Sequence, residues 1–319
     1  MKIAFYGSSG FSLAILKKLF DFHKLGKLDL IYIVSQSSKQ KKFGKEIVDN
    51  PVVDYCKVNS LKFLTPDKIK DKFFQNYLDE HPVDLVIVAA YGKILPESLI
   101  NKSKYGFLNF HGSLLPKYRG AAPVQFTILN QDINSAGITI IKMDKGMDTG
   151  QIIKKEKLNI KYEELQKITG GELMNRLADL SVEVMDKEFE YIFNPENWIL
   201  VPQEDNQATY CNEADMVKEN FEIKFEDGTK HAHGKIMGAN PAPIAFMEID
   251  NLKVNLFRSN ITDQPIEYTP KSKLCFHSYQ KRLYLELNDG LLEILEIQPI
   301  GKKAMDAKSF LNGYSKYIS

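Results

Sequence analysis

Short apolar runs of strand length alternate with helical patterns in the first part of the chain, and this alternation limits the fold more than any other feature. Lys2–Gly7 and Leu30–Val34 are such runs, and Asp84–Ala90 is almost continuously apolar, as in strands buried on both faces. Helical spacing follows the first run, from Phe11 to Phe20. The alternation predicts an α/β domain with a Rossmann-like, mostly parallel sheet. The turn Gly7–Gly10 lacks the G-x-G-x-x-G pattern, so no dinucleotide site is expected.

The character of the chain changes near residue 200. Residues 201–210 are polar and predict a linker. Beyond a short helical pattern, alternating runs such as Ile244–Ile249 and Leu291–Ile297 favour a small antiparallel β-barrel. We therefore expect a Rossmann-like domain over 1–200, a linker over 201–210 and a smaller β-barrel domain over 211–319. A chain of 319 residues is long enough for two cores.

Composition excludes several classes of protein. The 42 basic and 41 acidic residues nearly cancel, so any nucleic-acid site must come from a local cluster. Cys56, Cys211 and Cys275 are few and widely spaced, which argues against a disulfide framework or a Cys-based zinc site and fits the cytoplasm. His231 and His233 have no third ligand nearby in sequence and fit surface histidines better than a metal pair. No apolar run reaches membrane-spanning length, and no signal-peptide pattern opens the chain.

The chemistry is expected in the stretch 107–123, which reads FLNFHGSLLPKYRGAAP. It begins as an apolar strand and turns after His111, and the carboxyl ends of strands are where sites form in open α/β sheets. Asn109 and His111 are two residues apart, so on a strand both side chains point to one face and can converge on a single atom. A lone N-x-H also fits an ordinary strand end, but the flanking SLLPKYRGAAP favours a functional site.

This stretch resembles a known family. NFHGSLLPKYRGAAPVQ is similar to the signature of the formyltransferases that use 10-formyltetrahydrofolate, and the similarity runs from Met1 to about Gly313. The longer members with a C-terminal β domain, the methionyl-tRNA formyltransferases, share the closing pattern GKxxMxxxxFLxG at residues 301–313 and an interdomain QxxxxATY. The resemblance implies that the C-terminal barrel is OB-like and binds tRNA.

The activity that the resemblance implies is formyl transfer from 10-formyltetrahydrofolate to the α-amino group of methionyl-initiator-tRNA. It also implies a cytoplasmic monomer with folate and tRNA as partners, no membrane and no metal. Two alternatives stay open. One is a folate-dependent formyltransferase acting on a sugar-nucleotide amine or glycinamide ribonucleotide. The other is a non-catalytic RNA-binding protein on the same scaffold.

The resemblance also assigns site residues. Asp148 lies in a Met143–Gly150 loop that matches the GxDTG pattern of the family, although D-x-G and D-T-G are also ordinary turn sequences. It implies that Asn109 and His111 hold the oxyanion of a tetrahedral carbon and that Asp148 draws a proton from the amine. The implied folate contacts are Ser113, Leu114, Leu115 and Pro116, with Tyr91 and Gly92 lining the pterin slot mainly through the backbone.

A lysine cluster interrupts the α/β alternation over Gln36–Asn50. A cluster of this kind fits a solvated loop or a clamp on RNA phosphates equally well. The resemblance favours the clamp, because methionyl-tRNA formyltransferases have here an insertion that enters the acceptor arm of the tRNA. Phe43 stands where the family usually has a second arginine. The residues expected to contact tRNA are Lys39, Lys41, Lys42, Phe43 and Lys45.

Overall fold

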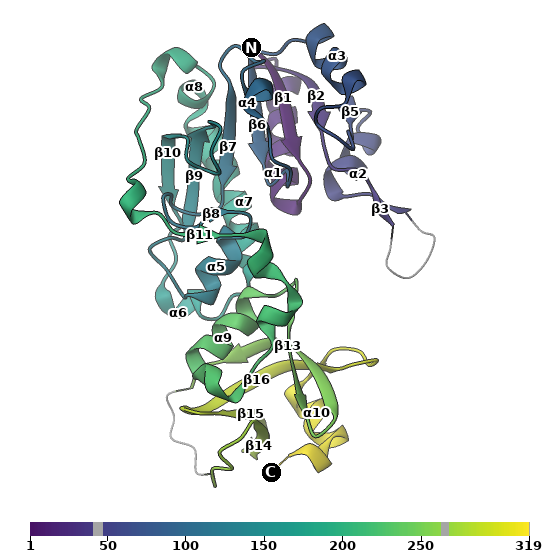
Figure 1. Cartoon of the computed structure of the whole chain (residues 1–319), viewed down its shortest axis with the longest axis vertical. Helices are drawn as coiled ribbons and strands as arrows, with labels where there is room; N and C mark the ends of the chain where they lie inside the picture. The colour runs from purple at the N-terminus through teal and green to yellow at the C-terminus, as the bar shows by residue number, and fades with distance from the viewer. Residues whose placement is uncertain (41–46, 263–267, 319) are drawn as a thin grey trace. The chain divides into compact units, whose positions relative to one another are not determined.

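The computed structural model describes residues 1–40, 47–262 and 268–318, which form two compact units (Figure 1). Unit 1 comprises Met1–Pro123, Ser135–Leu158 and Met174–Tyr210. Unit 2 comprises Val124–Asn134, Asn159–Leu173 and Cys211–Ser319. This division is more complex than the predicted limits at 200 and 211, because two short earlier segments belong to unit 2. The predicted linker, 201–210, belongs to unit 1.

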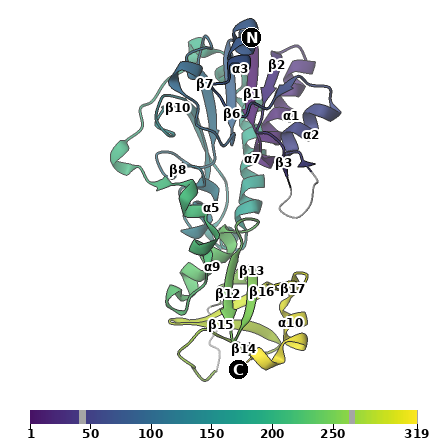
Figure 2. The same cartoon turned by 45° about the vertical axis from the view of Figure 1, so that its right-hand side comes forward.

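The described residues of unit 1 contain a seven-stranded sheet in the order β10-β9-β7-β6-β1-β2-β5 (Figures 1 and 2). Its strands are β1 Lys2–Gly7, β2 Asp29–Val34, β5 Phe63–Leu64, β6 Leu85–Ala89, β7 Phe107–His111, β9 Gly137–Lys142 and β10 Gln151–Lys157. The strands from β7 to β5 pair in parallel, which confirms the predicted mostly parallel α/β sheet. In contrast, β9 runs antiparallel to β7, and β10 antiparallel to β9.

Local sequence explains where the helices of unit 1 begin. The α1 helix, Gly10–Lys24, starts at Ser9, which forms a capping box with Ser12. The α2 helix, Pro51–Val58, starts at Asn50, whose side chain accepts from two backbone N–H groups of the first turn. The remaining helices with residues in unit 1 include α3 Lys72–Glu80, α4 Glu97–Ile100, α7 Gly170–Lys187 and α8 Phe189–Ile192. In the part of the chain that the structure describes, no helix is both long and apolar enough to cross a bilayer.

Unit 2 is built on an antiparallel sheet, as predicted. Its described strands run in the order β12-β13-β16-β15-β14, and β17 pairs with β16. They are β12 Ala245–Ile249, β13 Leu252–Asn260, β14 Cys275–Tyr279, β15 Arg282–Leu287, β16 Gly290–Pro299 and β17 Met305–Asp306. The helices α9 Gly228–Gly238 and α10 Ala307–Gly313 accompany the sheet. Closure of this sheet into an OB-like barrel stays a prediction.

One histidine of unit 2 differs from the expectation. His231 is half exposed, as a surface histidine should be, but His233 is buried on α9 and only 2% exposed. Its Nε2 donates to the Gln166 carbonyl at 2.9 Å, and its Nδ1 lies 2.9 Å from the Ser259 hydroxyl, which donates to it. The prediction of two surface histidines was therefore wrong for His233. Residues two apart on a helix lie on different faces, so only one of the pair reaches solvent.

This burial predicts a pH-dependent stability. Burial lowers the pKa of His233 to about 4 from its ordinary 6.5. Between these values the unfolded chain binds a proton that the folded chain does not, so the free energy of unfolding should fall as pH drops from 6.5 to 4. The His233 share is on the order of 2–3 kcal/mol. Urea unfolding at pH 7 and pH 4.5 should show a smaller pH slope for His233→Gln than for wild type. The control His231→Gln should keep the wild-type slope, and an equal slope in His233→Gln contradicts the prediction.

Candidate active site

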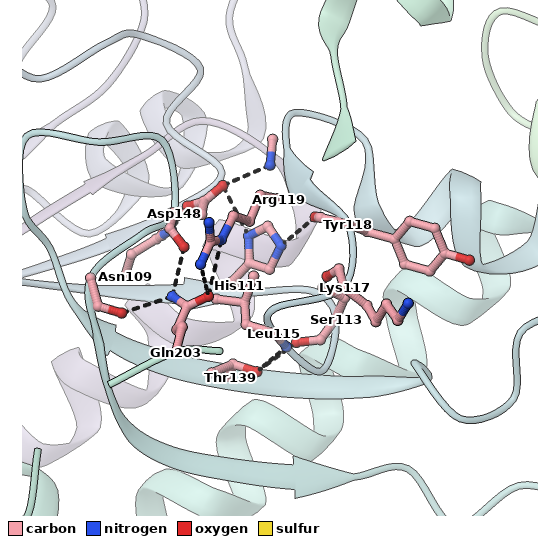
Figure 3. Close-up of polar contacts among 12 residues, drawn as sticks. Asn109, His111, Ser113, Leu115, Lys117, Tyr118, Arg119, Thr139, Asp148 and Gln203 are labelled. Carbon is pink, nitrogen blue, oxygen red and sulfur yellow. Dashed lines mark hydrogen bonds and ion pairs between the residues drawn. The ribbon is translucent and has the colours of Figure 1, made fainter. Parts of the chain in front are cut away.

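The Asp148 carboxylate connects the three residues expected to be catalytic (Figure 3). Its Oδ1 accepts from the Asn109 Nδ2 at 3.0 Å, and its Oδ2 accepts from the Gly120 backbone N–H at 2.9 Å. The same Oδ2 lies 3.5 Å from the His111 Nδ1. The structure thus brings Asn109, His111 and Asp148 together although Asp148 is far from the other two in sequence.

The loop that carries Asp148 reaches β7 by folding back along it. Because β9 is antiparallel to β7, the end of β9 lies beside the start of β7, and the Met143 N–H donates to the Phe107 carbonyl at 2.8 Å. The loop must then return towards the carboxyl end of β7 to reach Asn109 and His111. Asp148 adopts φ +54°, a left-handed backbone conformation that is uncommon outside glycine. This conformation is kept because the hydrogen bonds around Asp148 hold it.

The orientation of the His111 ring follows from its other nitrogen. Nε2 lies 2.8 Å from the Tyr118 carbonyl oxygen, which only accepts, so Nε2 carries the hydrogen. Nδ1 therefore faces Asp148, in a ring that is 4% exposed. A neutral imidazole has one N–H and can donate to only one of these acceptors, whereas an imidazolium donates to both. The Tyr118 carbonyl accepts the hydrogen bond from Nε2, one of the two N–H donors expected of His111. Nδ1 is therefore the ring nitrogen that faces the site.

Two residues that the sequence analysis did not single out support Asp148. The Gln203 Nε2 donates to the backbone carbonyls of Asp148 and Gly150, both at 2.7 Å. The Gln203 Oε1 accepts from the Arg119 Nε at 3.1 Å and from the Arg119 Nη2 at 2.9 Å (Figure 3). Arg119 is 1% exposed and also pairs with Asp205 at 2.6 Å. The only sequence signals for these two residues are that Arg119 lies within SLLPKYRG and that Gln203 lies in the polar stretch 201–210. The polarity of that stretch predicts a linker, not a part of the site.

The predicted folate loop divides into buried and half-buried residues. Ser113 and Leu115 are fully buried, whereas Leu114 and Pro116 are half-buried. The Ser113 hydroxyl donates to the Lys117 carbonyl at 2.7 Å, and the Leu115 N–H donates to the Thr139 hydroxyl at 3.0 Å. In this structure Ser113 and Leu115 thus stabilise the loop itself, and Leu114 and Pro116 retain surface for a ligand.

The predicted pterin-slot residues follow β6. The Tyr91 side chain is buried, and its carbonyl accepts from Gln36 Nε2 at 2.8 Å. Gly92 has φ +75°, and a Cβ at this position would collide with the same Gln36 amide. The close approach that glycine permits here is therefore made by Gln36. A role of Tyr91 and Gly92 in binding a pterin stays a prediction.

One residue of the lysine cluster lies in a two-stranded ribbon. Lys39 belongs to β3, Lys39–Gln40, which pairs antiparallel with β4, Ile47–Val48. Lys41, Lys42, Phe43 and Lys45 lie outside the described residues. Their contacts with tRNA stay a prediction.

Amide and imidazole nitrogens and a carboxylate thus surround one point near the carboxyl end of β7, in an α/β fold of the kind found in many enzymes. The family model described as formyl transferase matches residues 1–188, and the model described as formyl transferase, C-terminal domain, matches residues 215–315. The chain belongs to the formyl transferase family.

Individual relatives support the same family. A methionyl-tRNA formyltransferase of Syntrophomonas wolfei subsp. wolfei is 34% identical over 320 residues, which cover 99% of this chain and 96% of that protein. Another of that name, from Lachnospira eligens, is 32% identical over 98% of this chain and 96% of its own. An N-formyltransferase of Helicobacter canadensis, crystallised with folinic acid and dTDP-3-aminofucose, has the same fold, with a TM-score of 0.67 at 19% identity, over 92% of this chain and 98% of that one.

Proposed function

We propose that this protein transfers the formyl group of 10-formyltetrahydrofolate to the α-amino group of methionyl-initiator-tRNA, giving N-formylmethionyl-tRNA for translation initiation. The observation that carries the proposal is the similarity over nearly the whole chain, C-terminal unit included, to relatives named methionyl-tRNA formyltransferase. The convergence of Asn109, His111 and Asp148 on one point supports the chemistry.

The proposed roles of the three residues follow from their hydrogen bonds. In formyl transfer to an amine, the formyl oxygen becomes negative as the new C–N bond forms. The Asn109 amide has two N–H bonds, of which one donates to Asp148, and we assign the second to this oxygen. His111 Nδ1, which faces the same point, is the second donor in its protonated form. One such donor is typically worth about 2.7–4 kcal/mol in the transition state.

Asp148 is assigned to the proton that the attacking amine must lose. The carboxylate is about one-tenth exposed and accepts from Asn109 and Gly120, so its position is set on both oxygens. As an ionised acceptor it can take the proton directly or through one water. Breaking the bond between the formyl carbon and the folate nitrogen then requires a proton on that nitrogen, and we assign the return of this proton to the protonated Asp148.

The test of the acceptor is a formylation assay with purified full-length protein and 10-formyltetrahydrofolate. Methionyl-initiator-tRNA is the substrate, and a non-initiator methionyl-tRNA, a sugar-nucleotide amine and glycinamide ribonucleotide are the controls. Formylation of the initiator tRNA at least tenfold above each control supports the proposal. Formylation confined to either small amine assigns that acceptor instead. If no acceptor is formylated, the proposal that the protein is a formyltransferase is contradicted.

The lysine cluster gives a separate prediction about tRNA binding. Changing Lys39, Lys41 and Lys42 together to glutamine should weaken binding and reduce the slope of log K against log salt by up to about 2–3, since each lost phosphate contact removes roughly 0.7–0.9 from the slope. Binding is measured by filter retention between low and physiological salt. The control changes Lys24, Lys70 and Lys104, three exposed lysines of unit 1 outside the cluster, in the same way. An unchanged slope in the first variant removes the cluster from the tRNA interface.

A further inference from the structure

Three side chains that can bind metals meet inside the β-sheet of unit 2, whereas the residues assigned to formyl transfer belong to unit 1. Cys275 and His277 lie on β14, and Glu286 lies on β15 directly opposite Cys275 in the ladder. Residues two apart on a strand share a face, and cross-strand partners share it too, so the strand register itself brings the three together. The exposed fractions are 4% for Cys275, 6% for His277 and 2% for Glu286.

Their ligand atoms converge on one point. The Cys275 Sγ lies 3.3 Å from the His277 Nε2 and 3.4 Å from the Glu286 Oε2, and the last two atoms lie 2.6 Å apart. Nε2 is a single nitrogen with either one hydrogen or one lone pair, so it cannot fully satisfy two partners at once. A ring of three such atoms, each facing the other two, is the arrangement that a bound cation would explain.

The carboxylate is held in position from behind. The backbone N–H groups of Lys271 and Ser272 both donate to the Glu286 Oε1 at 2.9 Å, and that of Lys271 also reaches Oε2 at 3.1 Å. The Tyr268 ring packs edge-on against His277, with centroids 5.1 Å apart. Outer contacts of this kind orient the ligands of metal sites.

We propose that Cys275, His277 and Glu286 bind one divalent cation of the zinc class, with a fourth position for water. Thiolate, imidazole and carboxylate are the usual protein ligands of zinc, and a thiolate with a carboxylate balances its two charges inside the sheet. In a tetrahedral zinc site the distances between such ligand atoms are roughly 3.4–3.6 Å. The two edges at Cys275 already match this range closely, and only the His277–Glu286 edge has to open, by less than about 1 Å.

The site is independent of the proposed transfer reaction. All three ligands are in unit 2, on two strands that it would join, so its effect should be on the stability of that sheet. Binding releases the thiol proton of Cys275, and the affinity should therefore fall as pH is lowered. No metal site is predicted from the sequence, because the three cysteines are few and widely spaced and the family resemblance implies no metal.

The test titrates the full-length protein, stripped of metal by chelator dialysis, with Co²⁺ and then with Zn²⁺. We expect one equivalent of Co²⁺, a thiolate-to-cobalt band in the near ultraviolet that Zn²⁺ removes, and a Tm that rises with Zn²⁺ concentration. Cys275→Ser should abolish the band, and His277→Gln and Glu286→Gln should each weaken binding by about tenfold or more. The control Cys56→Ser removes a buried cysteine of unit 1 and should keep the band.

Two results overturn the proposal. One is a wild-type chain that takes up no cobalt, which would make the cluster an ion pair of His277 and Glu286 beside a thiol. The other is a Cys275→Ser variant that keeps the band. If that variant does not fold, as judged by circular dichroism, the wild-type titration decides by the presence of the band and its one-to-one stoichiometry. Formyl transfer can be measured on the same samples, so a failure of either proposal leaves the other testable.

Discussion

Replacing Asp148 with asparagine should lower kcat for formyl transfer by about 10³-fold, within the range for loss of a general base, and leave the fold intact. An amide of the same shape fits the space but cannot take a proton and removes the negative charge beside His111. It also places an N–H opposite either the Asn109 amide or the Gly120 N–H, so one of the two hydrogen bonds is lost. Steady-state kinetics with methionyl-initiator-tRNA measures the effect.

The control for this variant is Asp144→Asn, in the same loop. Asp144 Oδ1 accepts from the Gly146 N–H at 2.9 Å and from the Thr149 hydroxyl at 2.6 Å, and an asparagine oxygen can accept both bonds. Its turnover should stay within a few-fold of wild type.

Asn109→Ala and His111→Ala should each lose about 10²–10³ in kcat, the usual loss for one oxyanion donor. Near-normal turnover in the variant of Asp148, Asn109 or His111 removes that residue from the mechanism.

Gln203→Ala should lower kcat by about 10–100-fold although Gln203 is not expected to contact either substrate. The physical reason is that a small displacement of a catalytic group, here Asp148, strongly slows the reaction. The Gln203 amide holds the carbonyls of Asp148 and Gly150, and its loss frees the loop that presents Asp148. The loss of activity should appear in kcat, and KM for both substrates should stay within about threefold of wild type. The reason is that contacts made equally with the bound substrates and the transition state are not changed. Gln203 is therefore a positioning residue rather than a catalytic one.

The matched control is Gln207→Ala, an exposed residue of the same segment that bonds to Glu204. It should keep wild-type kcat and Tm. Arg119→Lys should resemble Gln203→Ala in kcat, because lysine cannot donate from the two guanidinium nitrogens that hold Gln203 while also reaching Asp205. If Gln203→Ala turns over normally, the bonds from Asn109 and Gly120 are enough to place Asp148, and the segment 201–210 has no part in catalysis.

The local patterns of the chain predicted much of the fold. The continuous apolar run of β6 and the helical spacing of α1 appear as predicted, because burial on both sheet faces and on one helix face requires those periods. The alternating runs of unit 2 became β12–β16 for the same reason. The pairing of Asn109 and His111 on one face also follows from strand geometry, which depends only on neighbouring residues.

Long-range pairing decided what these patterns could not. The rule that sites form at the carboxyl ends of parallel strands does not place Asp148, because β9 is antiparallel and ends beside the start of β7. Asp148 reaches His111 only through a loop held by Gly120 and by Gln203, which comes from a segment with no periodic pattern. The metal-binding cluster of unit 2 likewise depends on the register between β14 and β15.

The sequence by itself therefore determined the α/β and antiparallel β classes of the two units, the family, and the identity of the three polar residues at the centre of the site. Only the tertiary structure decided which atoms of those residues face each other, which segment holds the Asp148 loop, and that His233 is buried. The physical reason is that periodicity reports which face of an element is buried. The partner across that face is set by hydrogen bonds and packing between segments that are distant in the chain.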